Sequence, residues 1–348
     1  YTFDQTDTSN WYHPLGFAYY ADGAHDDVDE LEPGIVAPGS NSTCDVTNAC
    51  PTPRYKLNDE YLGVANDTGD FGLDHYEPKF FLPVVDWKDQ GNFTVELKLD
   101  DTVTQDIFYF CHIHQYMTGR IKISKDGKLV NPAYKPEIPY TYETPSKYDM
   151  ECGTSNIDKF QLPHAMCPER FLCNVPDEGN QALKKYASCI ESMDCHMVAG
   201  MTHEVPAGGS DEVSIFINQM IPHHQNAVNM AKALLKTGKL SCDDITEETD
   251  DCAMMGIVLS IINEQNFQIQ AMRGVHDNKE YSEHKECPLV EGDDSDKDEG
   301  GSVPSEPPKQ DAEGSNVTSA AMPRTSMKYY FAAVLSPFFS LMVAIILA

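Results

Sequence analysis

A short segment at residues 107–123, IFYFCHIHQYMTGRIKI, constrains the fold more than any other part of the chain. Its two ends alternate in the manner of β-strands, which predicts two strands joined by a turn. The turn carries a cysteine, two histidines and a methionine, with the spacing Cys111-x-x-His114-x-x-Met117. An ordinary hairpin does not need these residue types in its turn. The segment therefore predicts a β-domain with a chemical site beside the end of a strand.

The residue types in this turn are ligands that suit copper. A thiolate, two imidazoles and a weak axial thioether form the trigonal site of blue-copper proteins. Soft sulfur favours Cu(I) and imidazole suits Cu(II), so a compromise geometry lets the ion change oxidation state with little rearrangement. Cys111, His114 and Met117 supply three of the four ligands. We therefore predict a type 1 copper site that a second histidine from elsewhere completes.

The turn and the start of the chain together resemble the cupredoxin family. The C-x-x-H-x-x-M spacing followed by GRIKI is similar to the amicyanin-type ligand loop. Residues 1–25 resemble small cupredoxin-like domains in which FDQSDxSNxxHPL precedes that loop. The resemblance implies an antiparallel β-sandwich or barrel over residues 1–140, with His13 of its His-Pro pair as the first ligand. His75 stays an alternative first ligand, and His25 is a weaker one.

The strand-like runs of this region lie at residues 1–5, 15–20, 93–99, 107–111 and 120–124. Long loops are expected between them, at about residues 22–70 and again from residue 73 to Trp87. His112 follows Cys111 directly, as a histidine does in multicopper oxidases. A trinuclear cluster needs several His-x-His pairs, and this is the only one in the sequence, which argues against a laccase-like oxidase. His112 is expected to be an exposed histidine or a route for electrons.

The chain has eleven cysteines, and a disulfide at Cys111 is the competing explanation of its role. Without Cys111 an even number remains that could form disulfides. These candidates are Cys44, Cys50, Cys152, Cys167, Cys173, Cys189, Cys195, Cys242, Cys252 and Cys287. Cys44 and Cys50 are close enough to close a local ring, and Cys242 is expected to pair with Cys252.

The second half of the chain has helical periodicity. Apolar residues recur every three or four positions at residues 180–201, 211–238 and 250–275, and Gly238 marks the end of the second segment. We predict a Cys-rich connector with a first helix at residues 141–209 and a helical bundle at residues 210–286. The whole chain is thus expected to be a multidomain β + α protein.

The bundle carries a second group of soft ligands around the sequence MIPHHQ. Pro222 interrupts the helical hydrogen bonding there, so side chains can converge at a break. The run MIPHHQNAVNMA followed by INEQNFQIQAM resembles the helical, ferritin-like domain of unknown function 305, which implies metal binding, copper in particular. The candidate ligands are Met220, His223, His224, Met230, Met272 and His276. The alternative is that these methionines fill a core and that the histidines form a polar network.

The segment SMDCHMVAGMTH, at residues 192–203, has two possible roles. It adds Met193, His196, Met197, Met201 and His203 as a further soft-metal patch, or as a third wall of the bundle site. The competing explanation is that Cys189 and Cys195 form a disulfide with each other and that the methionines pack.

Charge and cysteine usage restrict the surroundings of the protein. A net charge of −30 repels polyanions, which argues against a nucleic-acid partner. The cysteines indicate an oxidising compartment. Glycosylation sequons agree with this compartment, and they lie at Asn41, Asn66, Asn92 and Asn316.

The C-terminal end has the layout of a glycosylphosphatidylinositol anchor signal. Residues 287–327 form an acidic stalk rich in Pro, Gly and Ser, and residues 328–348 form a hydrophobic tail. Small residues from Ser319 onward, a polar spacer and this tail match the signal, with Ser319 as the attachment residue. A tail-anchored helix is the alternative. An anchored protein needs a leader, and few residues precede His13, so we expect that the natural chain begins further upstream.

Three functions follow from these features. The first is a copper-binding protein, either secreted or on the extracellular face of the plasma membrane, that handles copper or transfers electrons to a redox or copper-transfer partner at the membrane. The second is an enzyme, a surface metalloreductase or oxidase in which the blue copper relays electrons, although no catalytic base or substrate motif stands out. The third is a structural glycoprotein without metal. The intact Cys111, His114 and Met117 argue against the third.

Overall fold

The computed structural model describes most of the first 290 residues, which form one compact unit. The described residues are 1–26, 29–38, 51–64, 70–99, 103, 105–133, 144–175, 180–205, 211–282, 285 and 287. The predicted anchor signal, most of the stalk, Cys44, Cys50 and the sequons other than Asn92 lie outside them. Asn92 is exposed. None of the helices within the described ranges has the length and apolar character needed to cross a membrane.

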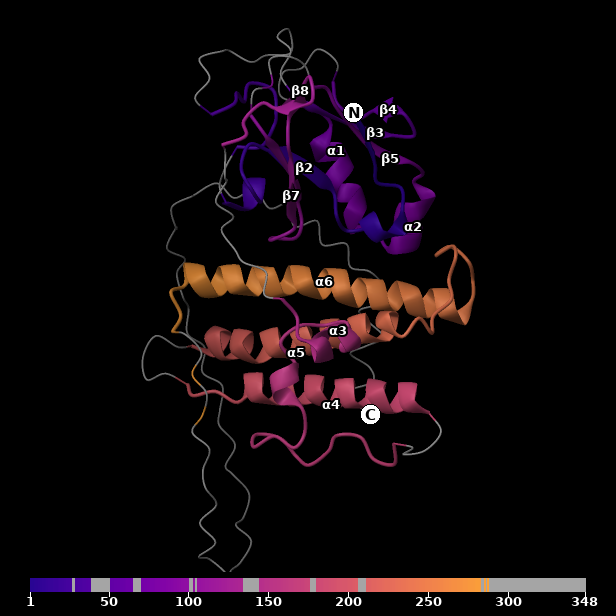
Figure 1. Ribbon diagram of the computed structural model, residues 1–348, viewed down its shortest axis with the longest axis vertical. Helices are drawn as coiled ribbons and strands as arrows, with labels where there is room; N and C mark the ends of the chain where they lie inside the picture. Colours follow the sequence, from indigo (N-terminus) through magenta and orange to yellow (C-terminus); the bar gives the residue numbers. More distant parts are fainter. Residues whose placement is uncertain are drawn as a thin grey trace, which may run out of the picture. The chain divides into compact units, whose positions relative to one another are not determined.

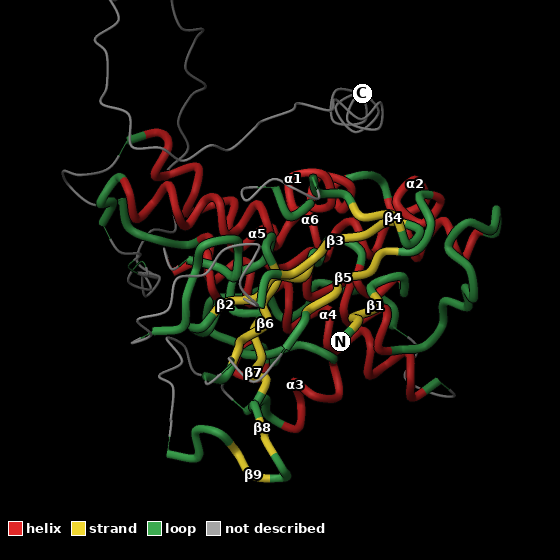
Figure 2. The backbone as a smooth tube through the Cα atoms, turned by 90° about the horizontal axis from the view of Figure 1, so that it is seen from above, coloured by secondary structure: helices red, strands yellow, loops and turns green. Residues whose placement is uncertain are grey.

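The first region of the chain consists of antiparallel sheets, as the sequence predicts (Figures 1 and 2). One sheet has the order β1-β5-β3-β4, formed by Thr2–Asp4, Phe93–Leu97, Pro53–Leu57 and Glu60–Tyr61. A second has the order β2-β6-β7, formed by Leu15–Ala18, Ile107–Cys111 and Thr118–Ile121. A short hairpin joins β8 (Ser124–Lys125) to β9 (Lys128–Leu129).

Aromatic side chains form the core of this region. Alternate residues of β5 point inward, and Phe93 stacks on Trp87 with ring centroids 5.0 Å apart. The prediction of a loop at residues 73–87 is wrong. The chain forms α1 (Leu73–Tyr76), a 3₁₀ helix (Glu77–Phe81) and α2 (Val84–Asp89) there. When the aromatic side chains of this segment are buried, its backbone is buried with them. Buried backbone groups need hydrogen-bond partners, and short helices provide them.

The prediction of a loop at residues 22–70 is also wrong in part. It contains β3 and β4, and β3 pairs with β5 along its whole length. Pro53 is the first residue of β3, a position that tolerates proline in a strand, so the proline does not mark a loop here.

The three predicted long helices are confirmed. They are α4 (Gln181–Met201), α5 (Glu212–Lys236) and α6 (Asp250–Asn278), and a shorter α3 spans Lys147–Cys152. Side chains of Asn180, Asp211 and Thr249 accept hydrogen bonds from the first turns of the long helices, which is what fixes where they begin. Gly238, with a φ of 63°, follows the end of α5.

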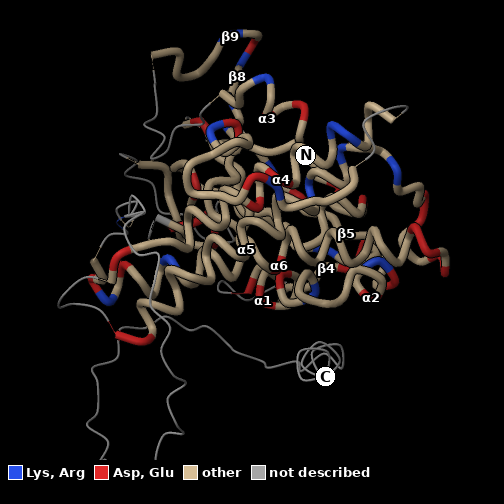
Figure 3. Tube along the Cα trace, turned by 90° about the horizontal axis from the view of Figure 1, so that it is seen from below, with Lys and Arg blue, Asp and Glu red and all other residues tan. Residues whose placement is uncertain are grey.

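Helix α5 lies between α4 and α6, and α6 lies against the β region (Figure 1). Met255, Leu259 and Phe267 of α6 pack against the aromatic core. Between Asp251 and Arg273, Glu264 is the only charged residue of this helix, which is tan over most of its length in Figure 3. A helix with so little charge suits a position between two layers.

Three disulfides are formed within the described residues. They are Cys152–Cys189, Cys167–Cys195 and Cys242–Cys252. The last was predicted. The alternative pairing of Cys189 with Cys195 is wrong, because six residues of α-helix separate two Cα atoms by about 9 Å along the axis, too far for a disulfide.

The expectation that Cys111 alone would be left over is wrong as well. Cys173 is free and exposed, and Cys287 is free and partly exposed, in addition to the buried Cys111.

Candidate metal centre

The register of two strands brings the start of the chain to the predicted turn. Strand β2 pairs antiparallel with β6 so that Leu15 lies opposite Cys111. His13 precedes β2 by two residues and therefore lies beside the residues that follow Cys111. The Gln5 side chain donates to the His13 carbonyl at 2.8 Å, and the Tyr55 hydroxyl donates to that of Leu15 at 2.9 Å. The His13 backbone is thus held on both sides.

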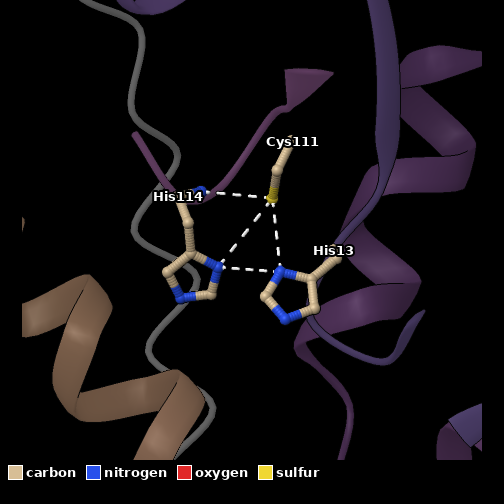
Figure 4. Close-up of side chains that lie close together, drawn as sticks. All are labelled: His13, Cys111 and His114. Atoms are coloured by element: carbon tan, nitrogen blue, oxygen red, sulfur yellow. Dashed lines mark hydrogen bonds between the residues drawn. The ribbon is translucent and has the colours of Figure 1, made fainter. Parts of the chain in front are cut away.

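Three potential ligand atoms converge at this point (Figure 4). The Cys111 Sγ lies 3.5 Å from His13 Nδ1 and 3.8 Å from His114 Nδ1. The two Nδ1 atoms are 3.1 Å apart. Three ligands around one ion, at bond lengths of about 2.0 Å to nitrogen and about 2.3 Å to sulfur, would be separated by about 3.5 Å (N to N) and about 3.7 Å (S to N) in a trigonal plane. The side chains therefore already have nearly the spacing of a metal site.

The protein environment keeps the two rings neutral at neutral pH. Burial, with a contribution from His114, lowers the pKa of His13 to about 4, and burial also lowers the pKa of His114. Both rings therefore carry a lone pair. Burial raises the pKa of Cys111 to about 12, although backbone N–H groups of His114 and Ile113 favour the thiolate. The thiol keeps its proton unless a cation replaces it.

Backbone hydrogen bonds shape the turn that carries Cys111 and His114. The Cys111 N–H donates to the Met117 carbonyl at 3.0 Å, which closes the turn. The His114 N–H points at the Cys111 Sγ, 3.3 Å away. The His25 ring donates from Nε2 to the Cys111 carbonyl at 2.8 Å, so this weaker rival ligand contacts the backbone of the site.

The structure places the remaining predicted ligands at different depths. Cys111 and His114 are buried, whereas the Met117 side chain is 45% exposed. His75 is exposed on α1 and is not part of the group formed by His13, Cys111 and His114. Of the two alternatives for the first ligand, His13 is therefore the one beside the thiol.

His112 is not the exposed residue that we expected. Its side chain is 6% exposed, with Nε2 3.1 Å from the Glu30 carboxylate and Nδ1 3.9 Å from that of Glu77. Burial lowers its pKa, but the two carboxylates outweigh burial and the net pKa is raised. Gly16 makes this position possible, because a Cβ at Gly16 would lie 2.3 Å from His112 Nε2. Successive residues alternate in direction, so His112 points away from the Cys111 site.

One residue at the site was missed by the sequence reasoning. Asn263 of α6 is 6% exposed, and its carbonyl accepts a hydrogen bond from His114 Nε2 at 2.9 Å. Its side-chain amide donates to the Trp11 carbonyl at 3.3 Å and also hydrogen-bonds the His13 ring. Asn263 lies in a helical stretch with almost no charged residues, and this is the only local signal that could have pointed to it.

Among the described residues, the predicted histidines of the helical region are not part of any group of three converging His, Cys or acidic ligand atoms. His224 donates from Nδ1 to the Met220 carbonyl at 3.0 Å, and its Nε2 lies 2.7 Å from Gln268 Oε1 on α6. His223 and Met230 are exposed. His276 contacts Asp277, with Nδ1 3.5 Å from Oδ1.

The additional candidates on α4 have different surroundings. His196 lines, together with His276 and Arg273, an open cavity of about 550 Å³ between α4, α5 and α6. Met193 is buried, and the Met197 sulfur accepts from Asn226 at 3.4 Å. Among the described residues the one further group of His, Cys and acidic side chains contains His164 and the disulfide-bonded Cys167 and Cys195.

Comparison with known proteins finds a relative for the helical region. Residues 176–276 match the family model described as Domain of unknown function (DUF305). The match begins ahead of α4 and covers α4, α5 and nearly all of α6, so the first helix, which we had placed in the connector, lies within the matched range. No curated protein and no solved structure matches the chain.

Proposed function

We propose that this protein binds copper at a type 1 site formed by His13, Cys111, His114 and Met117, and that it transfers electrons or handles copper. The observation that carries the proposal is the convergence of one sulfur and two Nδ1 atoms with separations of 3.1 to 3.8 Å. Such a set of one thiol and two imidazoles, beside a thioether in the same turn, suits copper better than magnesium or calcium. The cupredoxin-like architecture is part of the same proposal.

The residues of this site have complementary roles. The neutral rings of His13 and His114 offer lone pairs without first losing a proton, so binding releases one proton only, from the Cys111 thiol. A bound copper ion would supply a centre that accepts and returns a single electron. Burial of Cys111 and His114 excludes water from the sulfur side, and the closed turn holds these two side chains, which would bind the ion, next to each other.

A second copper position in the helical region is the weaker part of the proposal. It rests on His224, whose Nδ1 donates to the Met220 carbonyl, the arrangement in which metal-binding histidines are usually held. A metal at Nε2 would have to replace the contact of that atom with Gln268 Oε1, 2.7 Å away. The resemblance to DUF305 supports it, and the other candidates are Met220, His223, Met230, Met272 and His276. We place the protein on the outer face of the plasma membrane because of its sequons, disulfides and anchor-like tail.

Copper loading of the purified chain tests this function. We expect at least one tightly bound copper per chain, and an intense visible charge-transfer band from the thiolate that Cys111→Ser abolishes. Cys173→Ser is the matched control, because Cys173 is also free but exposed, and it should leave the band unchanged. A chain that holds no copper, or a Cys111→Ser variant with an unchanged spectrum, would contradict the proposal.

A further inference from the structure

We propose that Asn263, in the helical region, is the positioning residue for both histidine ligands, so that two regions of the chain share the metal centre. The inference rests on the proposed copper function. Asn263 lies near the middle of α6, 149 residues from His114, yet it contacts His114, the His13 ring and the backbone of Trp11.

The contact with His114 decides which ring nitrogen carries the proton. A main-chain carbonyl can only accept a hydrogen bond, so at 2.9 Å from Asn263 O the Nε2 atom must be the protonated one. In the neutral ring the lone pair then lies on Nδ1, which faces the Cys111 sulfur. Helix α6 thus selects the tautomer that can bind a metal beside the thiol.

The contact with His13 has the same effect. The Asn263 amide nitrogen donates to the Trp11 carbonyl, which turns the amide oxygen toward other donors. The His13 ring has Nδ1 toward the sulfur and toward His114, so its far nitrogen is the one free to donate to that oxygen.

The helix face that carries Asn263 is fixed against the β region on both sides of it. Leu259 packs on the aromatic core, the Phe267 ring lies 6.0 Å from that of Phe81, and the Gln270 side chain donates to the Ile113 carbonyl at 3.2 Å. These residues recur at intervals of three and four and therefore share one face with Asn263. A face anchored in this way can hold a carbonyl at one place beside a ligand ring.

This arrangement also closes one side of the centre. The His114 ring is 4% exposed, and its Nε2 edge is occupied by α6. A redox partner therefore cannot touch this ring without displacing the helix. The helical region is in this way a part of the copper site, in addition to any metal of its own.

Asn263→Leu in the full chain tests the inference. The substitution keeps the side-chain size but removes both amide hydrogen bonds, and we expect copper affinity to fall 10- to 100-fold, the usual effect of losing such a supporting contact. The charge-transfer band should shift as His13 loses its orientation. Asn226→Leu is the matched control: it also removes a buried amide of the helical region, one that donates to Asp194 Oδ1 at 3.0 Å and contacts neither ring, so affinity and band should stay unchanged.

A measurement without metal separates this inference from the copper function. Nitrogen-15 NMR of the imidazoles in the metal-free protein should find the proton on Nε2 of both His13 and His114, and in Asn263→Leu the His13 signal should change. Protons on Nδ1, or an Asn263→Leu variant with wild-type His13 signals and copper affinity, would overturn the proposal. If the wild type shows the Nε2 protons but takes up no copper, the proposed function fails and the positioning role stands.

A second variant addresses folding. Asn263→Asp keeps an oxygen that can accept from His13, so it should retain more of the wild-type affinity than Asn263→Leu. Circular dichroism of each variant shows whether the helices are intact. Equal losses of affinity in the Asp and Leu variants, with intact helices, would contradict the role of the acceptor oxygen.

Discussion

The β region and the helical region carry the same kinds of soft ligand, but they arrange them differently. In the β region, residues 98 positions apart in the sequence place their Sγ and Nδ1 atoms 3.5 Å apart. In the helical region, His223, His224, Met230 and His276 point to different surroundings. Antiparallel pairing brings distant residues to one point, whereas a helix spreads its residues along an axis at about 1.5 Å each. Ligand-rich sequence therefore predicts a compact site more reliably when it lies in a turn between paired strands.

The largest expected effect comes from replacing single histidines of the β region by alanine. His13→Ala removes one of the three converging ligands, and we expect copper affinity to fall more than about 100-fold, beyond the loss of a supporting contact. His75→Ala is the control, because His75 is exposed on α1 and should have no effect. Copper titration against a competing chelator measures both. A larger loss in the His75 variant would show that the ligand set is assigned wrongly.

Acid should weaken the metal-free β region through His13. Its pKa is lowered from 6.5 to about 4 in the folded protein, so the unfolded chain binds the extra proton first as the pH falls. Stability is complete above about pH 6.5 and is lost toward pH 4, by at most about 3 kcal/mol. Urea unfolding at pH 7.0 and at pH 4.5 measures this loss.

The control for the pH effect is His13→Gln. The wild type should lose more free energy of unfolding between the two pH values than this variant does, because the variant has no ring to protonate at that position. Parallel pH curves for the two proteins would mean that His13 is not the group responsible.

The buried position of the His112 side chain depends on the absence of a side chain at Gly16. A Cβ there would lie 2.3 Å from His112 Nε2 and 2.8 Å from the Phe110 ring, so Gly16→Ala must displace one of them. We expect it to destabilise the protein by about 1 to 3 kcal/mol, as overpacking usually does. Gly127→Ala meets no atom within 4 Å but has a φ of 73°, so it measures backbone strain without a clash. If Gly16→Ala lowers the melting temperature less than Gly127→Ala does, this account of the buried His112 is contradicted.

The sequence predicted local features well and long-range contacts poorly. The turn from Cys111 to Met117 and the three long helices follow from spacing and periodicity, which are properties of neighbouring residues. His13 came from a family resemblance, because no local pattern states which strand will pair with β6. Asn263 was missed for the same reason, since it reaches His114 only through the packing of α6 on the β region.

The remaining errors have local causes. Strand β3 lies within a segment that was expected to be one long loop, and the aromatic, proline-rich run before Trp87 suggested a loop where short helices bury it. Counting cysteines gave the number of possible disulfides but not the partners. Cys189 and Cys195 share one helix, and the geometry of that helix sends each of them to a cysteine outside it.

The smallest expected effect comes from the helical region. His224→Ala removes the ring between Met220 and Gln268. If the two regions bind copper independently, it should lower the number of coppers per chain and leave the charge-transfer band of the Cys111 site within error of the wild type. Asn229→Ala, in the same helix, is the control for a general disturbance of α5. Because Gln268 lies five residues beyond Asn263 on α6, a shifted band in His224→Ala would mean that this helix couples the two regions. The β region and the helical region would then be coupled through α6, although their ligands are arranged differently, and a shift of α6 would be the change to measure.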